Sequence, residues 1–85
     1  MTNFGVDWKP EILGDLANIW LSSPDRQTVT KAQARIDRLL ERDPLGVGME
    51  VSEGLRKLHV PPLEVLYSVD EDRHVVDIDD LGYRP

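Results

Sequence analysis

The sequence predicts a small α+β domain in which a helical hairpin packs on a curved, mostly antiparallel sheet. Two amphipathic helical patterns occupy the first half of the chain, and three apolar strand patterns separated by short turn signals occupy the C-terminal third. A short alternating stretch precedes the helices, so the expected order is β-α-α-β-β-β. The 85 residues are enough for one small core, and we expect residues 1–85 to form a single domain.

The N-terminal half is predicted to be a strand followed by two helices. Residues 3–8 alternate apolar and polar positions, as a half-buried strand does. Pro10 suits the first turn of a helix, and a second helix is expected from Pro24 to Arg42, ending before Pro44. The expected buried positions of the first helix are Ile12, Leu13, Leu16, Ile19 and Trp20. Those of the second helix are Val29, Ala32, Ile36, Leu39 and Leu40.

The C-terminal half is predicted to be three strands. Residues 49–60 indicate a strand interrupted near Gly54, and Pro61-Pro62 marks the next turn. Residues 63–69 alternate, with Tyr67 expected in the core. An acidic turn at residues 70–73 leads to the last strand, where Val76 and Ile78 are expected to face the core.

Composition excludes several classes of function. Cysteine is absent, which excludes thiolate metal sites and favours a cytoplasmic setting, and no apolar run is long enough to cross a bilayer. We expect no cofactor and no metal, because two histidines are too few for a histidine cluster and Asp77 with Asp79 lacks a third ligand by spacing. The net charge of −6 is concentrated in residues 64–85, which carry seven acidic and two basic side chains.

The order and spacing of these patterns resemble the RelE/ParE superfamily of bacterial type II toxin–antitoxin, or plasmid stabilisation, modules. The resemblance runs through the residues Trp8, Pro10, Ile19-Trp20, Ala34 to Leu40, Asp43-Pro44, Gly54-Leu55-Arg56, Val65 to Asp70 and Tyr83-Arg84. It implies a toxin with a cognate antitoxin encoded nearby. It also implies one of two targets, because RelE-like toxins cleave mRNA on the ribosome and ParE-like toxins poison DNA gyrase.

The resemblance to RelE-like enzymes proposes a set of basic catalytic residues. Lys57 matches one of the family's strand lysines, and Arg84 matches the arginine that closes the last strand. Arg56 and His59 are neighbouring candidates for phosphate contact and proton transfer. Glu64, however, stands where the family has an arginine before the Val-x-Tyr of the third strand. A carboxylate there repels a phosphate, which argues against mRNA cleavage.

The sequence therefore leaves the enzymatic activity open. The family's C-terminal tyrosine has no counterpart, and Tyr83 could replace it only if the end of the last strand curls inward. One hypothesis is a ribosome-dependent endoribonuclease, that is, an mRNA interferase. The other is a non-catalytic protein of the same fold that inhibits gyrase by contact or retains only antitoxin binding. The blandest alternative is an interaction domain unrelated to toxins, in which the charged side chains simply pair across strands.

A second group of basic residues lies on the second predicted helix. Four side chains spaced +4, +3 and +4 fall within about 60° of one another on a helix of 100° per residue. These residues, which we call the basic face, are Lys31, Arg35, Arg38 and Arg42. An ordinary solvated helix surface explains the pattern. The alternative is a binding surface for rRNA phosphates or for an acidic partner segment.

Overall fold

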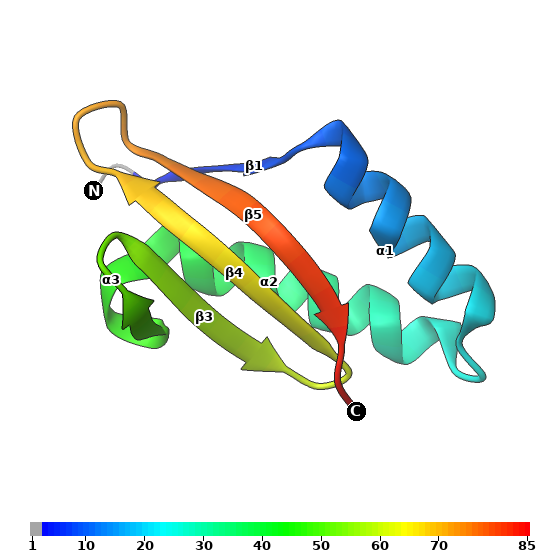
Figure 1. Cartoon of the computed structure of the whole chain (residues 1–85). Coiled ribbons are helices and arrows are strands. Elements are labelled where there is room, and N and C mark those ends of the chain that lie inside the picture. The colour runs from blue at the N-terminus through cyan, green and yellow to red at the C-terminus, as the bar shows by residue number, and fades with distance from the viewer. Residues whose placement is uncertain (1–2) are drawn as a thin grey trace.

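The computed structural model describes residues 3–85, so the first two residues of the expected domain lie outside the described part. A five-stranded sheet carries two long helices on one face (Figure 1). The elements are β1 (Gly5–Trp8), α1 (Pro10–Ser22), α2 (Arg26–Arg42), α3 (Pro44–Val47), β2 (Met49–Ser52), β3 (Leu55–Val60), β4 (Leu63–Asp70) and β5 (Val75–Tyr83). The predicted α+β class is confirmed. No helix among the described residues is long and apolar enough to span a membrane.

The helices begin and end where capping chemistry allows. Proline occupies the start of α1, where its missing N–H has no helical partner to lose. The second helix begins at Arg26 and not at Pro24, because the Asp25 side chain accepts a hydrogen bond from the Thr28 N–H at 3.2 Å and caps the first turn. Pro44 ends α2 as expected but opens the single turn α3, which the sequence did not indicate.

The sheet has the order β1-β5-β4-β3-β2. Only the β1–β5 pair is parallel, and the other three pairs are antiparallel. The expected interrupted strand at residues 49–60 is a hairpin of β2 and β3, which turns at Gly54 with φ of 76°. A positive φ is easily reached only by a residue without a Cβ, so Gly54 lets the chain reverse direction between the two strands. A register shift in the β4–β5 pair lies between Leu66 and Tyr67.

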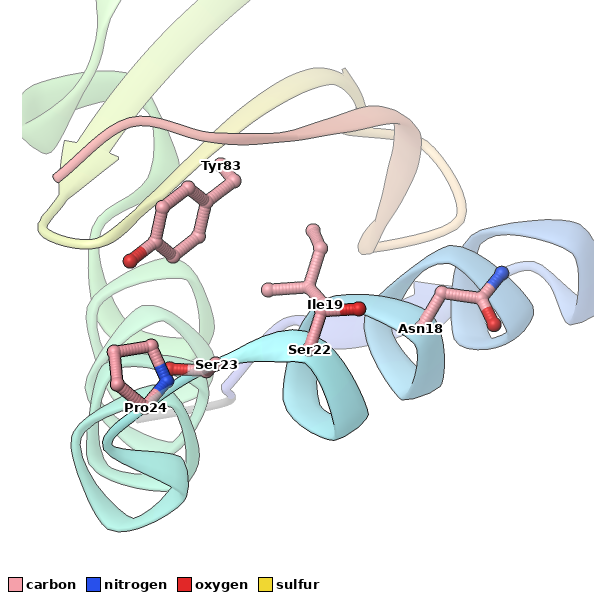
Figure 2. A pocket seen from close by; sticks show the side chains of 6 residues that line it. All are labelled: Asn18, Ile19, Ser22, Ser23, Pro24 and Tyr83. Atoms are coloured by element: carbon pink, nitrogen blue, oxygen red, sulfur yellow. The ribbon is translucent and has the colours of Figure 1, made fainter.

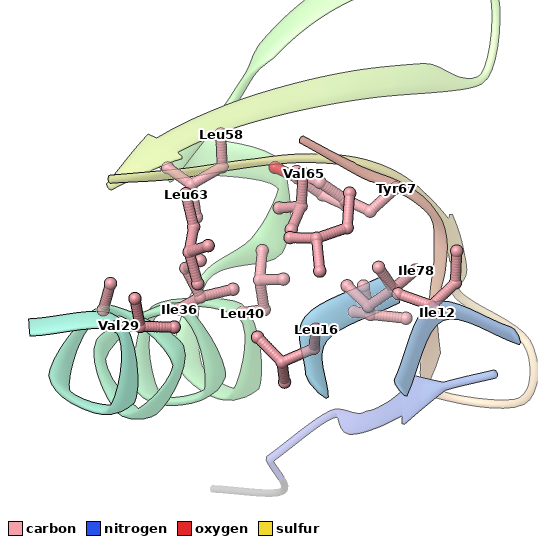
Figure 3. Close-up of a cluster of buried hydrophobic side chains, with 13 residues drawn as sticks. Ile12, Leu16, Val29, Ile36, Leu40, Leu58, Leu63, Val65, Tyr67 and Ile78 are labelled. Atoms are coloured by element: carbon pink, nitrogen blue, oxygen red, sulfur yellow. The ribbon is translucent and has the colours of Figure 1, made fainter. Parts of the chain in front are cut away.

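The core lies between the helices and the inner face of the sheet, the face that they cover (Figure 3). Helix α1 packs over β5, whereas α2 packs against β3 and β4. The fully buried side chains include Val29, Ile36 and Leu40 from α2 and Leu63, Val65, Tyr67, Val76 and Ile78 from the strands. The expected positions of Tyr67, Val76 and Ile78 are thus confirmed.

Two residues of the expected α1 stripe are not in the core. Leu13 is 46% exposed and Trp20 is 38% exposed, whereas Ile12 and Leu16 are buried. At 100° per residue, Leu13 and Trp20 lie roughly 60° to 80° around the helix from the centre of the buried stripe formed by Ile12 and Leu16. They are turned toward the groove between α1 and α2.

Two hydrogen bonds join β1 and the residue before it to helix α2. The Trp8 indole Nε1 donates to Asp37 Oδ1 of α2 at 2.6 Å, and the backbone N–H of Phe4 donates to the Glu41 carbonyl at 2.8 Å. Because β1 also pairs with β5, this edge strand connects the helix layer to the sheet.

Truncating α2 at the centre of the core is expected to be costly. Leu40→Ala should lower the free energy of unfolding by about 2–5 kcal/mol, because Leu40 is fully buried and its loss leaves a cavity. Urea denaturation followed by circular dichroism measures the change. Leu45→Ala removes the same atoms from a side chain that is 46% exposed and should cost about 1 kcal/mol or less. Equal losses in the two variants would contradict this placement of the core.

Candidate functional site

The alternation of side chains along the strands divides the candidate catalytic residues between the two faces of the sheet. Residues directly paired across strands share a face. Arg56 pairs with Tyr67, whose side chain is in the core, so Arg56 lies on the inner face. Lys57 is the next residue along β3 and therefore lies on the outer face. His59 pairs with Glu64 there.

The outer-face candidates meet at the end of the β3–β4 hairpin. Arg84 Nη1 donates to the Glu64 carboxylate at 2.7 Å. The Arg84 carbonyl is 2.7 Å from Nε2 of His59, and because a carbonyl only accepts, Nε2 carries the proton. The Arg84 N–H donates in turn to the Pro62 carbonyl at 2.6 Å. Arg84 is therefore held to the β3–β4 hairpin by three contacts.

Glu64 stands where the family has one arginine, and it also forms an ion pair with the second, Arg84. The hydrogen bond from Arg84 lowers the pKa of Glu64, and the charges of Arg84, Lys57 and His59 lower it further, while partial desolvation raises it. Glu64 is therefore ionised near neutral pH and compensates the charge of Arg84. A phosphate approaching Arg84 must compete with Glu64 for the guanidinium.

Arg56 is engaged on the other face of the sheet. Its Nη2 donates to the carbonyls of Leu45 at 2.9 Å and Gly48 at 2.7 Å, and its Nε is buried without a partner. The Tyr67 hydroxyl donates to the Pro44 carbonyl at 2.6 Å beside it, and burial raises the pKa of Tyr67. Arg56 satisfies backbone carbonyls around α3, and the structure does not bring its side chain together with those of Lys57 and His59 on the outer face.

Tyr83 also lies away from the outer-face residues. It pairs with Leu63 and projects on the helix side, because β5 stays extended to its last residue and does not curl. Its ring lines a pocket of about 360 Å³ with Asn18, Ile19, Ser22, Ser23 and Pro24 (Figure 2). Tyr83 therefore does not join Lys57 and Arg84, and the condition under which it could replace the family's tyrosine is not met.

The basic face of α2 is solvent-exposed over its whole length. Lys31, Arg35, Arg38 and Arg42 are all exposed, in agreement with the helical spacing. No group of three or more potential metal ligands occurs among residues 3–85. Asp79, which shares the last strand with Asp77, forms an ion pair with Lys9 Nζ at 3.0 Å.

Sequence reasoning missed an apolar groove between the two helices. The groove has a volume of about 400 Å³. It is lined by Leu13, Leu16, Ala17, Trp20, Val29, Thr30 and Gln33. The signal was present, because α1 has more apolar positions than one core-facing stripe requires. Periodicity alone places Leu13 and Trp20 in the core, because it cannot distinguish a buried stripe from an apolar groove beside it.

The arrangement of a helical hairpin on one face of this sheet is shared with a solved structure. The crystal structure of the toxin–antitoxin complex RelBE2 from Mycobacterium tuberculosis matches with a TM-score of 0.80 at 20% sequence identity, over 99% of this chain and 94% of the other. No curated protein sequence is significantly similar.

The family model described as the ParE toxin of the type II toxin–antitoxin system parDE matches residues 6–84. The chain therefore belongs to the ParE toxin family, within the RelE/ParE superfamily that the sequence pattern predicted.

The Glu64–Arg84 pair gives a testable pH dependence. Because Arg84 lowers the pKa of folded Glu64, this pair stabilises the fold above the unfolded pKa of the carboxyl and is lost as the pH falls through the folded value. In Arg84→Gln the pKa of Glu64, measured by carboxyl carbon NMR, should rise. Lys9→Gln breaks the other ion pair, with Asp79, and should leave the pKa of Glu64 unchanged. An unchanged Glu64 pKa in Arg84→Gln would show that the ion pair does not form in solution.

Proposed function

We propose that this ParE-family toxin acts by contact with a protein target, DNA gyrase being the target that the family resemblance implies, and not by cleaving mRNA. The observation that carries the proposal is the Glu64–Arg84 ion pair. Glu64 stands where the family has an arginine before the Val-x-Tyr of the third strand, and it pairs with Arg84, which matches the arginine that closes the family's last strand.

The placement of the other candidates supports the same proposal. General acid–base cleavage of RNA needs cationic groups and a proton donor gathered around one phosphate. Arg56 is bonded to backbone carbonyls on the inner face, and Tyr83 projects toward the helices. The protonated Nε2 of His59 is directed at a carbonyl. Lys57 is left as the cation on this face that no described ion pair or side-chain hydrogen bond engages.

Ribosome-dependent mRNA cleavage is the second candidate. The observation in its favour is that Lys57, His59 and Arg84 lie at one corner of the outer face, within the electrostatic range at which they shift the pKa of Glu64. For this reaction Glu64 has to release Arg84 to the substrate phosphate.

A paired assay separates the two mechanisms. The purified protein should inhibit DNA supercoiling by gyrase and should leave a defined mRNA intact on programmed ribosomes. Lys57→Ala should change gyrase inhibition by no more than about twofold, as expected for a surface substitution worth about 0.5 kcal/mol or less. Cuts in the A-site codon that disappear in both Lys57→Ala and Arg84→Ala would overturn the proposal and establish the ribonuclease.

We also propose that the cognate antitoxin covers the groove between α1 and α2. Leu13 and Trp20 are large apolar side chains that remain 46% and 38% exposed, and they border an apolar hollow. An amphipathic helix that places apolar residues at i, i+3 and i+4 into such a groove buries this surface. Trp20 is already oriented for a contact, because its Nε1 donates to Thr30 Oγ1 at 3.1 Å and Arg26 covers its ring at 4.8 Å.

Charge placed in this groove should weaken antitoxin binding. We expect Leu13→Asp to raise the Kd for the cognate antitoxin at least about tenfold, which corresponds to the loss of one buried apolar contact of about 1.4 kcal/mol. Isothermal titration calorimetry measures the change. Leu45→Asp is the matched control, since Leu45 is equally exposed at 46% but lies on α3. A similar loss in both variants, or none in Leu13→Asp, would place the antitoxin elsewhere.

A further inference from the structure

The basic face of α2 is a straight, continuous array of positive charge. From Lys31 to Arg42 the helix rises about 16 Å, at about 1.5 Å per residue. The four side chains point away from the core, since Ala32, Ile36 and Leu40 of the same helix are buried against the sheet. All four side chains are exposed, so the array is presented to solvent along most of α2.

The charge of this array is not compensated within the described part of the protein. Residues 3–85 contain two ion pairs, Lys9–Asp79 and Glu64–Arg84, and neither involves the basic face. The two acidic residues of α2 do not interrupt it. Asp37 accepts the indole hydrogen bond of Trp8, and Glu41 is half-buried.

Positive charge is concentrated on α2, and the rest of the protein is acidic. Helix α2 carries five basic and two acidic residues, whereas the whole chain has a net charge of −6. The acidic residue Asp77 lies on the outer face of the sheet, because its neighbours Val76 and Ile78 are buried on the inner face. A polyanion is therefore attracted to the basic face more strongly than to the rest of the surface.

The side chains of the basic face favour phosphate over other anions. Three of the four are arginines, whose planar guanidinium donates two parallel hydrogen bonds to a phosphate. The face holds no aromatic residue on which an unpaired base could stack, as single-strand binding surfaces do. It also holds no large exposed apolar side chain that could anchor a partner helix.

We infer that the basic face of α2 binds the phosphodiester backbone of a nucleic-acid duplex without reading its sequence. A duplex carries one charge per about 1.7 Å of its axis, so the 16 Å array can reach as many phosphates as it has cations. Arginine and lysine contacts to phosphates position a protein on a duplex and carry no base specificity. This inference does not depend on whether the toxin acts by contact or by cleavage.

Salt-dependent binding to a labelled DNA duplex tests the inference. Fluorescence anisotropy with the full chain measures affinity as a function of salt. The log of the association constant should fall against the log of the salt concentration with a slope of roughly −0.9 for each of about four neutralised phosphates. The double variant Arg35→Glu/Arg38→Glu should reduce the slope by about 2 and weaken binding at least about tenfold at about 50 mM salt. Circular dichroism confirms that the variant is folded.

The control changes the net charge equally at another place. Lys9→Glu/Arg73→Glu alters the positions before α1 and in the β4–β5 turn, and it should keep the wild-type slope. Equal loss in the two double variants would overturn the inference, because binding would then follow net charge alone. Absence of duplex binding, or tighter binding to the unpaired strand, would overturn it as well. A third outcome would also overturn the inference. If Arg35→Glu/Arg38→Glu kept duplex binding but lost antitoxin binding, the basic face would recognise an acidic protein segment.

Discussion

Burial of the apolar stripe of α2 against the inner face of the sheet is the interaction on which the other features depend. Ile36 and Leu40 are completely buried beside Val65 and Tyr67 of β4. Side chains alternate between the two faces along a strand, and paired residues share a face. Placing one residue of β4 on the inner face therefore determines the face of all the remaining residues in β4 and in its partner β3. This constraint sends Arg56 to the core side and Lys57 to the outer face.

The same constraint decides how the C-terminal charges are used. Glu64 and Arg84 reach one another on the outer face, and the backbone around Arg84 is held by His59 and Pro62. A carboxylate at this position has two consequences. It adds a repulsive charge toward phosphate, and it engages a cation that would otherwise be free to bind one.

The surfaces that remain for partners lie on the helix side. The groove between α1 and α2 is apolar, whereas the basic face of α2 is charged and has no apolar anchor. The two surfaces lie on different sides of α2. An amphipathic helix in the groove and a polyanion on the basic face would therefore contact different residues. A protein that works through contacts can use both without assembling a catalytic centre on the sheet.

The sequence by itself determined the fold class, the helical hairpin, the buried positions of the strands and the solvent exposure of the basic face, since each follows from the period of the apolar residues. Only the tertiary structure decided that residues 49–60 reverse at Gly54, that Leu13 and Trp20 line a groove, and that the side chains of Arg56 and Tyr83 lie on the opposite face of the sheet from that of Arg84. The physical reason is that periodicity reports which side chains avoid water within one element. Which elements meet, in which register, is set by packing and pairing between residues far apart in the chain, such as the 20-residue separation of Glu64 and Arg84.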